Sequence, residues 1–144
     1  MITAERYHDI STGHRVYGHE SKCAHLHGHN YRIHFKVAGD LDSIGRVIDF
    51  SVIKSKLCMW LEDNYDHKFL IYDKDPLKDV LKANDPDGVV IVSFNPTAEN
   101  IAKWLVDMIG PKQLKGTGCE LIEVKIEETA KCSATYTKDI ITIK

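Results

Sequence analysis

Residues 29–38 alternate polar and apolar side chains with a period of two, which is the pattern of a β-strand with one buried face. The apolar positions are Tyr31, Ile33, Phe35 and Val37. His29 shares their parity, and so does His27 just before it. Burial of two imidazoles at the start of an apolar face costs free energy unless a ligand or a hydrogen-bond donor uses their lone pairs. We therefore expect His27 and His29 to bind a ligand or, in the simpler alternative, to form hydrogen bonds with carbonyl groups.

A metal ion suits this pair, because residues i and i+2 of a strand point to the same side. The flanking sequence offers three candidates for a third ligand, His14, His19 and His25. His14 has the parity of Ile10 and Thr12 at the end of a first strand, which favours it over two histidines in the intervening loop. Three neutral imidazoles without a fourth protein ligand are typical of a catalytic zinc site with one open position.

Two other metal sites fit less well. An oxygen-activating iron site more often has two histidines and a carboxylate. A cupin site also uses His-x-His, but it needs a glutamate shortly afterwards, where this chain has Ile33 and His34. The pattern therefore favours zinc.

Cys23, four residues before His27, has two possible roles. As a fourth ligand it would close the site and make it structural. As a free thiol near a cation it would have a lowered pKa and could act as a base. Asp66 and His67 are adjacent at the end of an expected helix, where they are either solvated or an oriented proton carrier.

Glu128 is the carboxylate with the most informative position. It shares the parity of the apolar residues of the last strand region, which are Ile122, Val124 and Ile126. A buried carboxylate needs a donor, and the paired N–H groups of a bound heterocycle would supply two parallel hydrogen bonds. In the alternative, Glu128 lies past the strand end and reaches water.

The remaining sequence predicts an α+β fold with an antiparallel sheet and helices on one face. The expected elements are strands at 1–10 and 29–38, a helix from the Asp49 cap to about Asn64, a loop with room for one short helix at 73–88, a strand at 89–94, a helix from the Thr97 cap to Gly110-Pro111, and two or three strands from Glu120 onward. We expect one domain over residues 1–144.

Composition narrows the classes of partner. The net charge is −2 without a block of basic residues, so neither nucleic acid nor a membrane surface is expected as a partner. No apolar run is long enough to cross a bilayer, and the first residues lack the apolar core of a signal peptide. The four cysteines have no paired spacing and are expected to be reduced thiols in a cytoplasmic protein.

The ordered motifs together resemble the 6-pyruvoyl-tetrahydropterin synthase family, and most closely its bacterial 6-carboxy-5,6,7,8-tetrahydropterin synthase branch. The matching segments are His14, CAHLHGHNY from Cys23 to Tyr31, GRVIDF from Gly45 to Phe50, the Asp66-His67 pair, NPTAEN from Asn95 to Asn100, and Glu128-Thr129 followed by Ala134 and Tyr136. The segment from Ile10 to Val16 departs from the family's usual Phe-x-Ala-Ala-His-x-Leu. This departure concerns the pocket wall and leaves the metal and acid–base residues in place.

The resemblance implies the tunnelling fold (T-fold), a four-stranded antiparallel sheet with two helices. It also implies trimers that stack in pairs into hexamers, with active sites between subunits. Zn²⁺ would be held by His14, His27 and His29. The implied catalytic and pterin-binding residues are Cys23 as base, Asp66 and His67 as its proton-relay partners, and Glu128 with Thr97 at the pterin ring.

The implied reaction converts 7,8-dihydroneopterin triphosphate to 6-carboxy-5,6,7,8-tetrahydropterin in 7-deazaguanine (queuosine) synthesis. The spacing Cys-x3-His-x-His is typical of this branch, whereas the pyruvoyl-forming branch usually has a longer insert. Formation of 6-pyruvoyl-tetrahydropterin from the same substrate is the first alternative. A non-catalytic zinc module that includes Cys23 as a ligand is the second. Arg15, Lys22 and Arg32 are near enough in sequence to meet the triphosphate.

Overall fold

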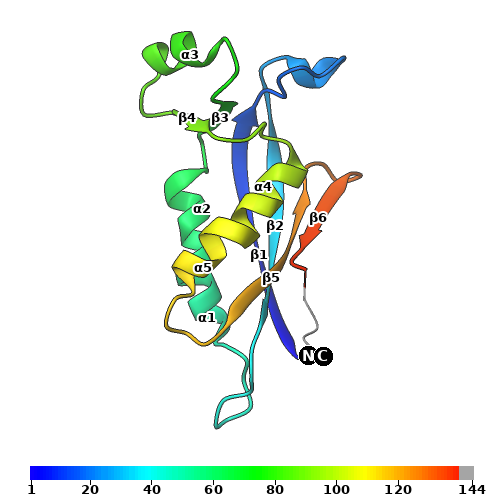
Figure 1. Cartoon of the computed structure of the whole chain (residues 1–144), viewed down its shortest axis with the longest axis vertical. Coiled ribbons are helices and arrows are strands. Elements are labelled where there is room, and N and C mark those ends of the chain that lie inside the picture. The colour runs from blue at the N-terminus through cyan, green and yellow to red at the C-terminus, as the bar shows by residue number, and fades with distance from the viewer. Residues whose placement is uncertain (140–144) are drawn as a thin grey trace.

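A computed structural model describes residues 1–139 and contains one mixed sheet with the strand order β4-β3-β1-β2-β5-β6 (Figure 1). The strands are β1 (Thr3–His14), β2 (His27–Ala38), β3 (Phe69–Tyr72), β4 (Val89–Val92), β5 (Glu120–Glu127) and β6 (Ser133–Thr137). The strands β1, β2, β5 and β6 pair antiparallel, whereas β3 joins β1 in parallel and β4 joins β3 in parallel.

The expected four-stranded antiparallel sheet is therefore wrong in strand number, because the sheet of the described chain has six strands. The two additional strands are β3 and β4. The strand β4 lies within the expected strand at 89–94, whereas β3 was missed, because its four residues FLIY show no alternation by which a strand could be recognised. Its parallel partner β4 requires a crossover, which the short helix α3 (Lys78–Asn84) provides. The chain thus adds a small parallel unit to one edge of the antiparallel strands.

The β1–β2 ladder runs without interruption from Thr3 opposite Ala38 to His14 opposite His27. Both strands are longer at this end than the expected ranges 1–10 and 29–38. The extension makes His14 and His27 direct cross-strand neighbours. It also places Thr12 opposite His29 on the same face.

Two long helices cover one face of the sheet (Figure 1). The first comprises α1 (Phe50–Ile53), a wide π-turn and α2 (Met59–Asn64); the second comprises α4 (Ala98–Trp104), a second π-turn at Leu105–Ile109 and α5 (Gly110–Gln113). Both expected caps are present. Asp49 accepts a hydrogen bond from the Ser51 amide, and Thr97 accepts one from the Asn100 amide.

The expected end of the second helix at Gly110-Pro111 is wrong, since the helix continues to Gln113. The Gly110 N–H donates to the Leu105 carbonyl, five residues back, which widens the turn just before Pro111. A wide turn accommodates a residue that has no N–H to donate. The proline therefore marks a bulge and not a helix end.

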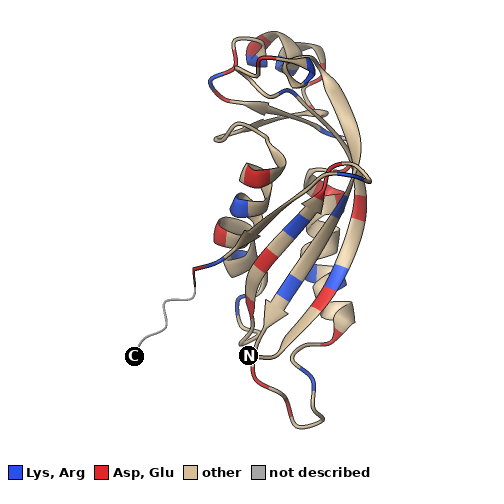
Figure 2. Cartoon of the chain, turned by 90° about the vertical axis from the view of Figure 1, so that its right-hand side faces the viewer, with Lys and Arg blue, Asp and Glu red and all other residues tan. Residues whose placement is uncertain are grey.

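The core lies between these helices and the facing side of the sheet. Tyr31, Ile33, Phe35 and Val37 are at most 2% exposed on that side. Along the opposite side of the sheet, acidic and basic residues alternate on neighbouring strands (Figure 2). Along residues 1–139, no helix has both the length and the apolar character needed to cross a bilayer.

Candidate metal and substrate site

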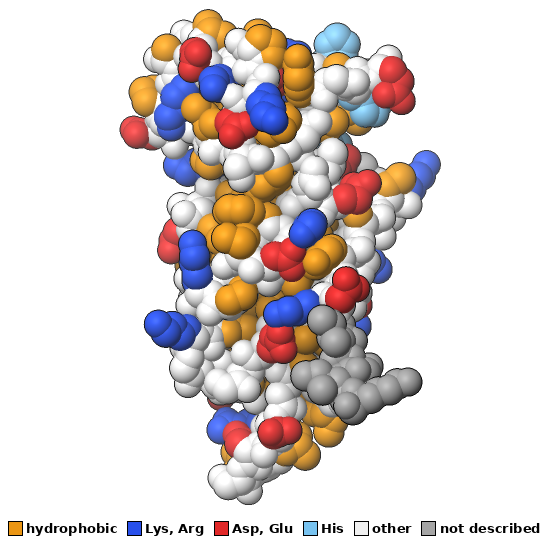
Figure 3. Space-filling view, in the orientation of Figure 1, with side chains coloured by type: hydrophobic (Ala, Val, Ile, Leu, Met, Phe, Trp, Pro, Cys, Tyr) orange, Lys and Arg blue, Asp and Glu red, His pale blue; other side chains and the backbone are white. Residues whose placement is uncertain are grey.

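Three histidines converge at the end of the β1–β2 ladder. His14 ends β1, His27 begins β2, and His29 follows two residues later on the same face. Each offers one ring nitrogen, and these nitrogens all lie within 4.8 Å of one another. In the space-filling view, the visible histidine side chains lie at the upper right, over the loop that joins β1 to β2 (Figure 3). The structure thus brings together the three histidines that parity singled out.

The other two loop histidines are not part of this group within the described chain. His25 is exposed, although its backbone carbonyl contacts the His27 ring. The His19 ring accepts a hydrogen bond from the Ser21 amide inside the loop. Both therefore have surroundings consistent with residues that do not bind a metal.

Backbone carbonyls fix the tautomers of two of the three converging histidines. The His14 Nδ1–H donates to the Pro96 carbonyl at 2.6 Å, and the His27 Nδ1–H donates to the His25 carbonyl at 2.7 Å. Each ring therefore presents the lone pair of Nε2, and the two Nε2 atoms are 3.1 Å apart. Partners of this kind commonly orient metal-binding histidines.

Two lone pairs at this distance repel unless a cation lies between them. A proton is a poor candidate, because burial lowers the pKa of His14 below its ordinary value of 6.5, even though the Pro96 carbonyl raises it in part. Tetrahedral zinc with Zn–N bonds of about 2.0–2.1 Å places its nitrogen ligands about 3.3–3.4 Å apart. His29 Nε2 is buried and makes no hydrogen bond of accepted geometry among the described residues, although the Glu128 carboxylate lies 3.2 Å away. The three imidazoles therefore fit a divalent metal ion.

Glu128 lies directly after β5 and turns toward the histidines. Its carboxylate Oε1 is 3.2 Å from His29 Nε2, and its side chain is 24% exposed. Its own amide donates to the Cys132 carbonyl, which fixes the turn between β5 and β6. Each of the two sequence interpretations is thus correct in part: the residue is past the strand end, but its carboxylate faces the buried side.

Tyr31 is a neighbour that sequence reasoning treated only as core. Its hydroxyl is 3.3 Å from His14 Nδ1, and its ring packs edge-on against the rings of His14 and His29. Burial raises its pKa far above the ordinary value of 10.0, and the negative charge of Glu128 raises it further. The available signal was parity, because Tyr31 follows His29 by two residues.

Cys23 lies in a short 3-10 turn, Lys22–Ala24, between the two strands. Its thiol is free and half-buried. It does not belong to the group of ligand atoms within 4.8 Å of one another. This placement favours the role of a nearby thiol over that of a fourth ligand.

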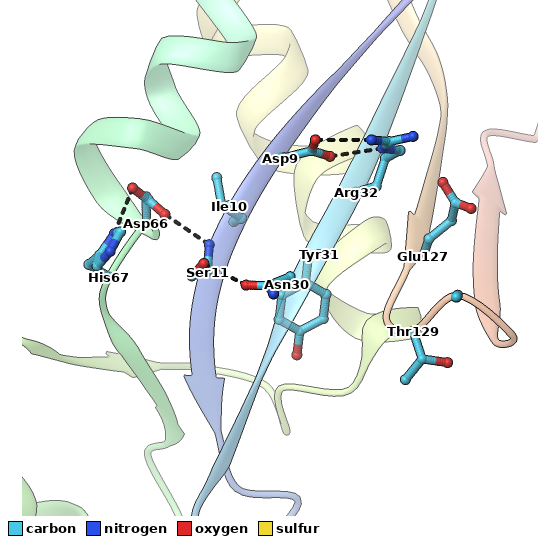
Figure 4. Close-up of a pocket in the computed structure, with 11 residues that line it drawn as sticks. Asp9, Ile10, Ser11, Asn30, Tyr31, Arg32, Asp66, His67, Glu127 and Thr129 are labelled. Atoms are coloured by element: carbon cyan, nitrogen blue, oxygen red, sulfur yellow. Dashed lines mark hydrogen bonds and ion pairs between the residues drawn. The ribbon is translucent and has the colours of Figure 1, made fainter.

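Asp66 and His67 form a hydrogen-bonded pair at the end of the first helix (Figure 4). Asp66 accepts from the Ser11 amide at 2.9 Å and from the His67 Nδ1–H at 2.8 Å. Partial burial raises the pKa of Asp66, but these hydrogen bonds outweigh it and lower the pKa below 3.8. His67 has a left-handed backbone with φ 59°, and its side chain is 81% exposed. An oriented and accessible imidazole of this kind can carry a proton.

This pair lies on the face of the sheet opposite the three histidines. It borders a cavity of about 660 Å³ together with Ser11 and Asn30, which hydrogen-bond to each other across the ladder (Figure 4). Ser11 and Asn30 alternate with Thr12 and His29, so their side chains point away from the three converging histidines. A single chain therefore does not bring Asp66 and His67 to the same side as the histidines. We call His14, His27 and His29 the metal group.

Thr97 caps α4 through its hydroxyl, which accepts the Asn100 amide at 3.1 Å. It follows Pro96, whose carbonyl orients His14, so it lies near the metal group along the chain.

Two of the basic residues suggested for the triphosphate are already paired with aspartates, Arg15 with Asp75 at 3.1 Å and Arg32 with Asp9 at 2.9 Å.

Comparison with known proteins agrees with this arrangement. A profile of the 6-pyruvoyl tetrahydropterin synthase family matches residues 3–139. The chain is 34% identical over 134 residues to the 6-carboxy-5,6,7,8-tetrahydropterin synthase of Rickettsia bellii, covering 92% of this chain and 97% of the relative. It is 34% identical over 128 residues to the enzyme of the same name from Aquifex aeolicus, covering 83% and 78%.

Solved structures show the same fold. An uncharacterized protein from Wolinella succinogenes superposes with a TM-score of 0.83 at 24% identity and covers 96% of this chain and 98% of that protein. The 6-pyruvoyl tetrahydropterin synthase of Caenorhabditis elegans superposes with a TM-score of 0.68 at 26% identity over 96% of each chain. This chain is therefore a member of the 6-pyruvoyl tetrahydropterin synthase family.

Proposed function

We propose that the chain is a zinc-dependent lyase that converts 7,8-dihydroneopterin triphosphate and one water molecule to 6-carboxy-5,6,7,8-tetrahydropterin, with release of triphosphate and acetaldehyde, in 7-deazaguanine synthesis. The observation that carries the proposal is the convergence of three imidazole nitrogens beside the Glu128 carboxylate. The names of the relatives from Rickettsia bellii and Aquifex aeolicus support the carboxy-forming reaction.

His14, His27 and His29 would hold the zinc ion. When bound, zinc supplies Lewis-acid chemistry that polarises oxygen ligands and lowers their pKa. The Glu128 carboxylate would grip the paired N–H groups of the pterin ring, with Thr97 beside it. This anchor would hold the substrate side chain beside the Cys23 thiol, which would take a side-chain proton as general base.

Asp66 and His67 would return protons from a neighbouring copy of the chain. Their place on the opposite face of the sheet supports this assignment, because the same chain cannot present them to its own histidines. The exposed His67 ring is available to another subunit. We propose a hexamer of two stacked trimers, with each active site completed across a subunit boundary.

Product analysis tests the reaction. Zinc-loaded protein is incubated with 7,8-dihydroneopterin triphosphate, and every product is identified by mass spectrometry. The proposal predicts triphosphate, acetaldehyde and 6-carboxy-5,6,7,8-tetrahydropterin in equal amounts. Release of triphosphate without acetaldehyde would instead assign the 6-pyruvoyl-tetrahydropterin-forming reaction.

Mixed oligomers test the shared active site. Cys23→Ala and Asp66→Ala are each expected to be inactive alone. Co-expressed in equal amounts, they should recover about a quarter of the wild-type activity, since random assembly forms that share of sites with both residues intact. Absence of any recovery in verified mixed oligomers would place both residues in one subunit's site.

A further inference from the structure

Asn95, in the turn between β4 and α4, is hydrogen-bonded to the loop that carries Cys23. The Asn95 side chain makes two hydrogen bonds with the backbone of one residue, Tyr17, which is 78 positions earlier in the chain. Its Oδ1 accepts from the Tyr17 amide at 3.0 Å, and its Nδ2 donates to the Tyr17 carbonyl at 2.8 Å. The amide thus pairs with Tyr17 in the same way as a neighbouring strand would.

The backbone of Asn95 is itself held in place. The Asn95 carbonyl accepts hydrogen bonds from the Asn100 side chain at 2.9 Å and from the Thr97 amide at 2.8 Å. Both partners belong to the capped first turn of α4. A residue whose backbone is anchored on a helix end is a rigid support for the segment that its side chain binds.

The clamped segment leads directly to the cysteine. The loop leaves β1 after His14 and returns to β2 at His27. Within it, the Val16 amide donates to the Cys23 carbonyl at 2.9 Å, so the residue next to Tyr17 is bonded to the cysteine's own backbone. The short turn around Cys23 has no side-chain cap. The position of the thiol therefore depends on the Val16–Tyr17 backbone, and that backbone depends on Asn95.

We infer that Asn95 is a positioning residue that holds the Cys23 thiol beside the metal group, an inference that rests on the proposed role of Cys23 as base. Successive residues of one turn then serve parts of one site. Asn95 holds the loop with the thiol, the Pro96 carbonyl orients the metal-binding ring of His14, and Thr97 caps α4 at the proposed pterin site. Because all three lie on one turn, the base and the metal ligand keep a constant relative position.

The test compares Asn95→Ala and Asn95→Asp with wild type, using zinc-loaded protein. Asn95→Asp keeps the acceptor for the Tyr17 amide and loses the donor to the Tyr17 carbonyl. Asn84→Ala is the matched control, because the one side-chain hydrogen bond of Asn84 among the described residues goes to the Val80 carbonyl in α3. Alkylation by iodoacetamide is followed at each cysteine by peptide mass spectrometry, with the exposed Cys132 as internal reference.

In Asn95→Ala, the ratio of Cys23 to Cys132 alkylation is expected to rise at least about threefold, because the freed loop opens more often. Turnover should fall about tenfold or more with KM within about twofold, since a misplaced base affects the chemical step more than binding. Asn95→Asp should fall between Asn95→Ala and wild type, and Asn84→Ala should match wild type.

Two results would overturn the inference. One is a Cys23 to Cys132 ratio in Asn95→Ala equal to that of wild type. The other is faster alkylation of the buried Cys58 in parallel with Cys23, which would mean that the whole fold has loosened. Alkylation requires no turnover, so failure of the proposed reaction would appear separately, as an absence of products in wild type.

Discussion

The two faces of the β1–β2 ladder carry polar side chains for different reasons. On the helix-facing side, each of three histidines places one ring nitrogen within 4.8 Å of the nitrogens of the other two. These residues are His14, His27 and His29. On the opposite side, charges meet opposite charges across the strands. These contacts are Arg32 with Asp9, His34 with Glu5 and Glu127, and Lys36 with Glu123.

The difference shows how a functional face can be distinguished from a solvated one. Polar groups on the open face find partners on the neighbouring strand, and water satisfies what remains. The helix-facing side is less exposed to water, so nitrogens that lie close to one another there require a further binding partner. Nitrogen lone pairs that lie close together on a poorly exposed surface therefore indicate a functional site. The presence of ionisable residues alone does not.

Removal of a buried-face ligand should have the largest effect. His29→Ala is expected to reduce bound zinc to less than about a tenth of the wild-type content and to abolish turnover, because two imidazoles hold zinc far more weakly than three. Metal content is measured by inductively coupled plasma mass spectrometry. His25→Ala is the matched control and should keep one zinc per chain, since only its backbone carbonyl contacts His27. Equal zinc content in the two variants would refute the three-histidine site.

Cys23→Ala separates a thiol base from a fourth metal ligand. We expect the variant to retain zinc and to lose about 10²–10⁴-fold in turnover, the range typical for loss of a general base. Cys132→Ala, at the exposed thiol, should behave as wild type in both respects. Loss of zinc from the Cys23 variant would instead support the structural zinc module.

Substitutions at two neighbouring residues of β2, one on each face of the sheet, should differ in their effect on the free energy of unfolding. Phe35 is fully buried on the helix-facing side, so Phe35→Ala is expected to cost about 3–5 kcal/mol in the free energy of unfolding. Lys36 points to the open face and pairs with Glu123 at 2.8 Å, so Lys36→Ala should cost less than about 1 kcal/mol. Urea unfolding followed by circular dichroism measures both. Similar costs at the two positions would mean that both faces are buried in the assembled protein.

The smallest effect concerns the pH dependence of that surface pair. The Lys36 ammonium lowers the pKa of Glu123 below its ordinary value of 4.5, even though partial burial raises it. The pair therefore contributes its stability above pH 4.5, and the contribution is lost as the pH falls through the lower folded-state pKa. The stability difference between wild type and Glu123→Gln should shrink between about pH 6 and about pH 3. A difference independent of pH would show that the ionised carboxylate does not contribute.

Local patterns in the sequence predicted much of this arrangement. The alternation in residues 29–38 grouped His27 with His29, and parity favoured His14 as the third histidine over His19 and His25, because cross-strand neighbours of a long ladder share a face. The Asp49 and Thr97 caps were also predictable, since capping depends on contacts within one helical turn. These features depend on residues close in sequence or on one regular pairing.

The parts that escaped prediction depend on contacts far apart in the chain. The apolar strand β3 is recognisable only from its pairing with β1 and β4. The face occupied by Asp66 and His67 follows from the left-handed turn at His67 and its bonds to Ser11. No periodicity in the segment YDHKFL encodes either feature.

The short junction between β3 and β1 affects how this chain can vary. The parallel pairing of β1 with β3 consists of two residue pairs, Gly13 with Phe69 and His14 with Leu70. A side chain on residue 13 would come within 2.6 Å of the Phe69 ring, so this junction is also tightly packed. We therefore expect changes in length to be tolerated better at the α3 end of the segment from β3 to β4 than at this junction. A change at the junction acts directly on His14, which would hold the metal.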